Sequence, residues 1–507
     1  MNDKTLIAFN TGILYVKLII TTILSLFATR ILLDALGEID FGVSALVSSI
    51  IAMLSFLSAS LTVSTQRYMS YHLGKNDISI QKTVFTTSFF LHLFIGLIIG
   101  GVLIAMTPII FSSVINIPEY RIEAARFIYY CTIGSTLLVI ITIPYDAVLN
   151  AHENMLTVAI VNIIEASIRL CGICLLLYVK FDKLYIYGII LLIVQIVSSL
   201  IKIIYCYLKY SETLLKKEYV DKTMIRNLFS FSMWNSIGAI AVVGRLQGMA
   251  VIINIFAGVI ANTAYGIANQ VSGLLNTVSS YLQKAMNPQI MKQEGAGCHE
   301  TMTLMALNQC KYSFILLISM GLPIIFVMHP LLSMWLGKFP PEAIIFCRLM
   351  VIIALIKQLG TGLQVAIQAV GNIKAYQLTV SLIIISSIGL AYFLLYLKYP
   401  VYYALISVLV VEFLLLFIRP WYAYKYADVS PKHYIYRVIL PVLGLSLFSI
   451  SLLYIAYWLL NPDSIIRAII FLIIGFTLTI ISYIPFMTKS EKNFVLAIFK
   501  SFLKEIQ

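Results

Sequence analysis

Charged residues are scarce in this sequence. Asp, Glu, Lys and Arg make up 11% of the 507 residues, whereas 61% are hydrophobic, and the mean hydropathy is +0.96. A soluble domain has about 25% charged residues. A chain this long and this apolar needs an apolar solvent for much of its surface. The composition therefore excludes an ordinary soluble protein and indicates a membrane protein.

Short chemical motifs are also scarce. Cys171 and Cys174 form a C-x-x-C, but it lies in a continuous apolar run and no second pair accompanies it. We interpret both as small apolar residues rather than as a metal or redox site. No Walker motif and no paired carboxylates stand out. We therefore expect no enzyme activity, no cofactor, no bound metal and no direct drive by ATP.

Long apolar runs occupy most of the sequence. A spanning helix needs about 20 mostly apolar residues, and a backbone in lipid must satisfy its own hydrogen bonds. The runs lack the alternation of barrel strands, so we predict helices. We expect the first run to be a span rather than a cleavable signal peptide. The fourteen predicted spans are 7–29, 41–63, 83–112, 125–149, 156–179, 185–206, 229–256, 262–283, 312–337, 344–369, 374–396, 401–419, 437–460 and 466–487.

Basic residues are distributed unevenly between the predicted loops. If the N-terminus is cytoplasmic, 21 of the 35 Lys and Arg residues fall in cytoplasmic segments, 9 on the opposite side and 5 inside spans. Cytoplasmic loops carry such an excess in membrane proteins. The bias predicts that both termini are cytoplasmic. It also explains the net charge of +13 without a nucleic-acid partner.

Two parts of the sequence resemble each other. Leu36-Gly37 precedes the second predicted span as Ala257-Gly258 precedes the eighth, and Gly74 stands 221 residues before Gly295. Parallel repeats of this kind are typical of transporters whose site lies between the halves. We predict an all-α polytopic membrane protein of about 14 helices, with two six-helix lobes in a pseudo-twofold arrangement plus two extra C-terminal helices. The predicted parts are an N-terminal lobe (1–206), a cytoplasmic linker (207–228), a C-terminal lobe (229–419), two additional helices (437–487) and a cytoplasmic amphipathic tail (488–507).

Three blocks of the sequence carry a family resemblance. They are LGEIDFGVSALVSSIIAMLSFLSASLTVSTQRYMSYHLGKND (36–77), IPYDAVLNAHENM (143–155) and INIFAGVIANTAYGIANQVSGLLNTVSSYLQKAMNPQI (253–290). They resemble the Wzx-type O-antigen flippases, which are polysaccharide biosynthesis proteins of the multidrug/oligosaccharidyl-lipid/polysaccharide exporter superfamily. The likeness runs along most of the chain and is poor after about residue 430.

The resemblance implies a function as well as a fold. It implies two six-helix lobes facing a central cavity, alternating access, and a location in the bacterial inner membrane. The implied cargo is an undecaprenyl-diphosphate-linked oligosaccharide, an O-antigen or capsule repeat unit, moved from the cytoplasmic to the periplasmic leaflet. Beyond this cargo and membrane lipid, the expected partners are a polysaccharide polymerase and glycosyltransferases.

Ionisable residues in the middle of predicted spans mark a candidate binding site, because such residues are costly in lipid and are usually functional. Lys17, Arg245 and Lys357 lie mid-way along three different spans. Cations in a cavity with apolar walls attract an anionic headgroup strongly. We predict that these three residues bind the diphosphate of the cargo.

The remaining central charges are predicted to pair or to couple transport to an ion. Glu165 and Arg169 are four residues apart, so they share a helix face and can form an ion pair. Glu412 is central in its span, and pairing with Lys357 is the structural alternative to a binding role for that lysine. The charged residues in the middle of the predicted spans thus comprise four cations and two acids, a surplus of two positive charges. The cations are Lys17, Arg169, Arg245 and Lys357, and the acids are Glu165 and Glu412.

Three other functions remain open at this point. A MATE-type antiporter for organic cations would need an excess of buried acids, which the central charges do not provide. A polytopic glycosyltransferase or polysaccharide ligase would need a long external loop, and the predicted external loops are short. A lipid II flippase would share both the architecture and the diphosphate.

Overall fold

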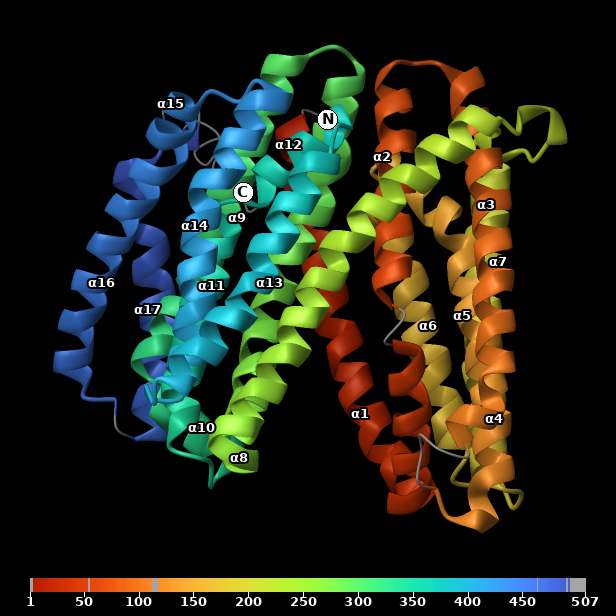
Figure 1. Ribbon diagram of the computed structural model, residues 1–507, viewed down its shortest axis with the longest axis horizontal. Coiled ribbons are helices and arrows are strands. Elements are labelled where there is room, and N and C mark those ends of the chain that lie inside the picture. The colour runs from red at the N-terminus through yellow and green to blue at the C-terminus, as the bar shows by residue number, and fades with distance from the viewer. Residues whose placement is uncertain (1–2, 53–54, 112–116, 463, 489–490, 493–507) are drawn as a thin grey trace, which may run out of the picture. The chain divides into compact units, whose positions relative to one another are not determined.

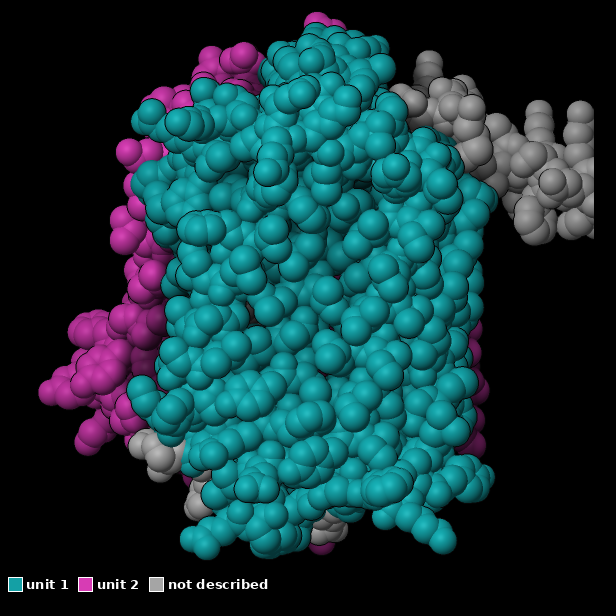
Figure 2. Space-filling view, turned by 90° about the vertical axis from the view of Figure 1, so that its right-hand side faces the viewer, with its two compact units in different colours: residues 1–240, 284–299 teal, residues 241–283, 300–507 magenta. Residues whose placement is uncertain are grey.

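The computed structural model describes residues 3–52, 55–111, 117–462, 464–488 and 491–492 (Figure 1). Within these ranges the regular secondary structure is entirely helical. The chain divides into two compact units, which Figure 2 distinguishes by colour. Unit 1 comprises residues 1–240 and 284–299, and unit 2 comprises residues 241–283 and 300–507.

Unit 1 is built mainly from long helices. They are α1 (Asp3–Ala52), α2 (Ser55–Gly74), α3 (Ile78–Ala105), α5 (Ile122–Ala151), α6 (Met155–Leu175), α7 (Lys183–Lys209) and both ends of α8 (Lys222–Gly295), with the single turn α4 (Thr107–Ile109). Helix α5 packs against α7, α2 and α3, and α1 packs against α6 (Figure 1).

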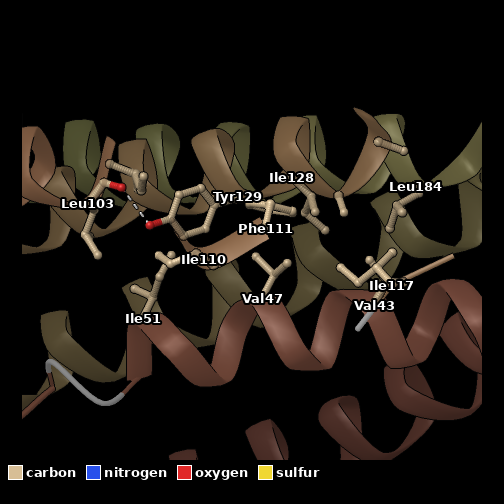
Figure 3. Packing of buried hydrophobic residues seen from close by; sticks show 13 residues of the cluster. Val43, Val47, Ile51, Leu103, Ile110, Phe111, Ile117, Ile128, Tyr129 and Leu184 are labelled. Carbon is tan, nitrogen blue, oxygen red and sulfur yellow. Dashed lines mark hydrogen bonds between the residues drawn. The ribbon is translucent and has the colours of Figure 1, made fainter. Parts of the chain in front are cut away.

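One apolar cluster in unit 1 joins α1, α3, α5 and α7 (Figure 3). Val47 of α1 and Ile128 of α5 are fully buried in it, and the Tyr129 hydroxyl donates a hydrogen bond to the Leu103 carbonyl oxygen at 2.9 Å. Lipid tails are as apolar as these side chains, so the cluster stabilises the unit by close packing rather than by transfer out of water. The hydrogen bond satisfies the one polar atom of Tyr129.

Unit 2 contains the middle of α8 and the helices that follow it. They are α9 (His299–Phe326), α10 (Met328–Leu336), α11 (Glu342–Gln358), α12 (Thr361–Val370), α13 (Lys374–Tyr396), α14 (Tyr403–Ala427), α15 (Pro431–Tyr434), a π-helical turn (Ile435–Ile439), α16 (Leu440–Leu460) and α17 (Ile465–Ile481). Helix α14 is central to this unit, because it packs against α11, α12 and α13.

Twelve helices of the described residues are long and apolar enough to cross a bilayer. The count differs from the fourteen predicted spans in two places. Helix α8 has 74 residues and is counted once, although it contains the predicted spans 229–256 and 262–283. The predicted span 41–63 is divided between the end of α1 and α2, and only its Ile39–Ser49 part counts, as a shorter apolar helix. The protein is an all-helical, multi-pass membrane protein.

Two glycines interrupt the long helices in the same way. Gly37 in α1 has φ 74° and ψ 172°, and Gly258 in α8 has φ 75° and ψ −172°. A positive φ with such a ψ is open to glycine and strained for other residues. These are the two positions that the sequence repeat pairs, so the repeat extends to the backbone conformation.

The compact units do not coincide with the predicted lobes. Residues 241–283 of α8 group with unit 2, whereas 222–240 and 284–299 group with unit 1. The lobes 1–206 and 229–419, the linker 207–228 and the additional pair 437–487 therefore stay a prediction about how the chain divides in transport. Most of the predicted amphipathic tail, 488–507, lies outside the described residues.

Candidate functional site

A carboxylate between two guanidinium groups forms a buried charged cluster in unit 2. Oε1 of Glu412 accepts a hydrogen bond from Nη1 of Arg245 at 2.9 Å, and Oε2 accepts one from Nη2 of Arg419 at 3.3 Å. The Glu412 side chain is 1% exposed, Arg419 is 6% exposed and Arg245 is 11% exposed. A carboxylate this buried stays charged only with such partners.

Helix geometry brings the three groups together. Glu412 and Arg419 are seven residues apart on α14, which is close to two helical turns, so both side chains project from one face. Arg245 reaches the same carboxylate from α8. Gly360, just before α12, leaves room for the arginine, because a Cβ at this position would overlap Cδ and Nη1 of Arg419.

Lys357 adds a third cation to this cluster. It lies near the end of α11, is partly exposed, and interacts electrostatically with Glu412, Arg245 and Arg419. The next residue, Gln358, accepts hydrogen bonds from Ser279 Oγ at 2.7 Å and from Gln283 Nε2 at 3.0 Å. The cluster therefore combines three cations and one acid with a neighbouring network of amide and hydroxyl groups.

The predicted ion pair of Glu165 and Arg169 lies on α6 in unit 1. Nη2 of Arg169 is 3.3 Å from Oε1 of Glu165, and Oε2 of Glu165 accepts a hydrogen bond from Ser198 Oγ at 3.2 Å. The Arg169 side chain is 45% exposed and that of Glu165 is 25% exposed. The two groups are thus in contact on α6, but they are far more accessible than the acid of unit 2.

Lys17 is the central charge of a second cluster, which is also in unit 1. It lies on α1, is partly exposed, and interacts electrostatically with Lys284, Glu165, Lys202 and Asp146. Lys202 and Asp146, on α7 and α5, form a salt bridge with Nζ 2.9 Å from Oδ1. Lys17 therefore belongs to unit 1, while Arg245 and Lys357 belong to unit 2.

Comparison with known proteins identifies the family. The family model described as "Polysaccharide biosynthesis protein" matches residues 7–293. The chain belongs to this family. No curated protein sequence matches the chain significantly.

Solved structures show which fold this family member has. A MATE protein in a bent conformation superposes with a TM-score of 0.74 at 13% identity, covering 84% of this chain and 97% of that one. An outward-facing multidrug-resistance MATE transporter of the MOP superfamily gives 0.73 at 13% identity, covering 85% and 97%. A MOP-superfamily transporter from Pyrococcus furiosus gives 0.70 at 13% identity, covering 84% and 96%. The chain has the MATE-like transporter fold, and fold and family together indicate a membrane transporter.

The sequence does not predict two residues of the charged clusters around Glu412 and Lys17. Arg419 and Lys284 were assigned to cytoplasmic loops, but Arg419 lies inside α14 and Lys284 inside α8. The predicted spans stop at 419 and 283 because charged residues lower the local hydropathy, whereas both helices continue. The seven-residue spacing from Glu412 is the signal that could have located Arg419.

The alternative pairing of Glu412 involves different cations from the one that the sequence suggested. The prediction paired this acid with Lys357, and the hydrogen bonds of Glu412 in the described chain go to Arg245 and Arg419.

No metal site is evident among the residues that the structure describes, because no group of three or more His, Cys, Asp or Glu side chains there could hold a metal ion. The Cys171 side chain is exposed and Cys174 is partly exposed, both on α6.

Proposed function

We propose that the protein is a flippase that moves an undecaprenyl-diphosphate-linked oligosaccharide from the cytoplasmic to the periplasmic leaflet by alternating access. The observation that carries the proposal is the match of residues 7–293 to the polysaccharide biosynthesis family in a chain with a transporter fold. The cargo is an O-antigen or capsule repeat unit. The protein acts in the bacterial inner membrane with both termini in the cytoplasm, alongside the polymerase and glycosyltransferases of the same pathway.

Lys17, Arg245 and Lys357 bind the diphosphate in this proposal. The charge of their surroundings supports the assignment, because cations outnumber acids in both clusters. Arginine can hold two phosphate oxygens with its planar fork, whereas lysine acts as a point charge. Gln283, which is partly exposed and donates to the buried Gln358, is the amide of this network that is available to a sugar hydroxyl.

The same charge balance argues against a MATE-type antiporter for organic cations. A cation site needs accessible acids, and Glu412 is nearly fully buried between two arginines. For the Pyrococcus furiosus transporter, a reversed polarity of the binding pocket suggests a different function. In this chain, the excess of cations around Lys17 and Lys357 supports an anionic cargo. A lipid II flippase satisfies the same electrostatics and is separated from this proposal only by the sugar that is carried.

Complementation tests the proposed site. The gene is expressed in a strain that lacks its own flippase and produces the matching repeat unit. Lys17→Ala and Arg245→Ala should each abolish surface polysaccharide while the protein still reaches the membrane, because the phosphate loses a counter-charge in a poorly solvated site. Arg245→Lys should give a partial defect, since it keeps the charge and loses the fork.

The matched control is Lys338→Ala, which removes an exposed lysine between α10 and α11. It should leave polysaccharide production unchanged. Full production by the double variant Lys17→Ala, Arg245→Ala would remove these residues from the mechanism and leave the cargo open. Failure of the wild type to complement, together with flipping of lipid II or efflux of cationic dyes in proteoliposomes, would replace the proposed function itself.

A further inference from the structure

The three ionic groups around Glu412 differ in how far they can be reached. Arg245 retains 11% of its side-chain exposure, while Glu412 retains 1% and Arg419 retains 6%. Arg245 is thus the group of this triad that a ligand can contact first. Its guanidinium is already held by Glu412, so an anionic ligand has to compete with that carboxylate.

Transfer of Arg245 to a ligand would cost free energy at Glu412, which would lose one of its two arginine partners. A buried carboxylate that loses a partner bears much of its desolvation cost unpaired, and this cost opposes ligand binding. Whatever else holds Glu412 therefore influences how readily Arg245 can leave. Arg419 is the second group that donates to this acid.

Arg419 has unused capacity for this task. Its Nη2 donates to Oε2 of Glu412 at 3.3 Å, and within the part of the chain that the structure describes its buried Nε has no hydrogen-bond partner. Oε1 of Glu412 is occupied by Arg245. When Arg245 leaves, Oε1 becomes available, and Nε and Nη2 can bind both oxygens as the bidentate fork that arginine and carboxylate prefer.

We propose that Arg419 is a positioning residue that takes over Glu412 while Arg245 transfers from this carboxylate to the diphosphate of the cargo. The inference rests on the proposed function and adds a partner exchange to it. No proton has to move, because both arginines and the acid stay charged throughout. Gly360 is required for this arrangement, because a Cβ at this position would overlap the Arg419 side chain.

The exchange makes a prediction that a purely structural role does not. Arg419→Lys keeps the charge and loses the fork, so binding should weaken on the order of tenfold, a typical coupling between sites. The neutral pair Glu412→Gln, Arg419→Gln removes the competitor as well as its holder. It should bind at least as tightly as the wild type. A residue that only supports packing would leave the double variant no better than Arg419→Lys.

The measurement is equilibrium binding of undecaprenyl diphosphate to the purified full chain in detergent, with undecaprenol as the uncharged probe. Gly360→Ala disturbs Arg419 in a second way, because the added Cβ displaces the arginine side chain from Glu412. This variant should therefore weaken binding as Arg419→Lys does. Gly389→Ala is its matched control, because a Cβ there meets nothing within 4 Å. Thermal unfolding of each variant identifies any that fails to fold, and the remaining variants then decide the outcome.

Two failures are distinguishable. If the wild type prefers undecaprenyl diphosphate to undecaprenol but Arg419→Lys and Gly360→Ala bind like the wild type, the exchange is wrong and the proposed function stands. The same holds if the double variant binds no better than Arg419→Lys. If the wild type does not discriminate between the two lipids, the proposed diphosphate cargo is wrong, and the proposed partner exchange is wrong as well.

Discussion

Glu491 is an acid whose neighbours account for its charge state. Its Oε1 lies 2.5 Å from Nζ of the buried Lys311 and accepts a hydrogen bond from the Tyr312 hydroxyl at 2.8 Å, and its Oε2 accepts one from the Thr488 amide at 2.7 Å. Burial raises the pKa of Glu491, but the hydrogen bond and charge of Lys311, with the Thr488 amide, outweigh it and lower the pKa to about 2. The contact ties the segment after α17 to α9.

This pair predicts a pH-dependent stability. A carboxyl group whose pKa is lower in the folded state stabilises the fold above its unfolded pKa of 4.5, and loses that contribution as the pH falls towards 2. Glu491→Gln should therefore be less stable than the wild type at pH 7, by about 2 kcal/mol. Thermal unfolding in detergent should show the gap narrowing between pH 4.5 and pH 2. A gap that is the same at pH 7 and pH 3 would contradict the assignment.

The pair on α6 gives a second prediction for single residues. Neutralising either Glu165 or Arg169 leaves the other charge without its partner in a membrane-spanning helix, so each single change should lower membrane abundance more than the double change Glu165→Gln, Arg169→Gln. Because Arg169 is 45% exposed, the difference should be modest, below about 1 kcal/mol. Quantitative blotting of membrane fractions measures it. A double variant much worse than both singles would show that the ion pair is not what these residues provide.

Sequence reasoning located single charges in the spans but not their partners. Lys17, Arg245 and Glu412 stand out because each interrupts an apolar run. Arg419 and Lys311 do not, since Arg419 stands at the end of the predicted span 401–419 and Lys311 directly before the span 312–337, although both are buried in helices. The contact of Arg245 with Glu412 is decided by packing between α8 and α14, and no periodicity within one helix encodes it.

The ends of α2 and α8 form an unusually close contact between elements within unit 1. A Cβ on Gly74 would overlap the carbonyl oxygen of Lys292, and a Cβ on Gly295 would overlap that of Tyr71. Gly74 and Gly295 are 221 residues apart, as are Tyr71 and Lys292. The two helix ends thus approach each other through equivalent residues of the repeat, backbone against backbone, as small residues allow.

This contact predicts the effect of adding one methyl group. Gly74→Ala or Gly295→Ala should lower thermal stability by about 2 kcal/mol or more, because neither carbonyl can move without displacing its helix. Gly273→Ala is the control: it lies inside α8, and its Cβ would meet nothing within 4 Å. Alanine is the better helix former, so this variant should be as stable as the wild type or slightly more so. Equal stability of all three variants in detergent would refute the close approach.

At this scale the sequence predicted most of the helices. Apolar runs of about 20 residues located them, because a spanning backbone has few alternatives. It did not predict that α1 and α8 are each interrupted at a single glycine, or that Gly37 and Gly258 share one positive-φ conformation. Those features depend on backbone geometry at one residue, to which a hydropathy window is insensitive.

For the whole molecule, the charge bias survives the corrections made by the structure. Of the 21 basic residues assigned to the cytoplasmic side, Lys284 lies in the charged cluster around Lys17, and Arg67, Lys311 and Arg419 are buried among the described residues. Removing these four leaves 17. None of the nine basic residues on the opposite side is buried. The remaining excess is nearly twofold and still predicts a cytoplasmic N-terminus under the rule that governs such loops.

Reporter fusions test this topology directly. Fluorescent-protein fusions at Lys216 and at the C-terminus should fluoresce, and alkaline phosphatase fused at the same places should be inactive, because both positions are predicted to be cytoplasmic. A phosphatase fusion at Lys180, in the exposed turn between α6 and α7, should be active and serves as the matched control. Since α7 is the predicted span between Lys180 and Lys216, opposite signals at the two sites also test whether it crosses the membrane. Phosphatase activity at Lys216 would invert the orientation, and the proposed direction of transport would then need a cargo that is loaded from the other leaflet.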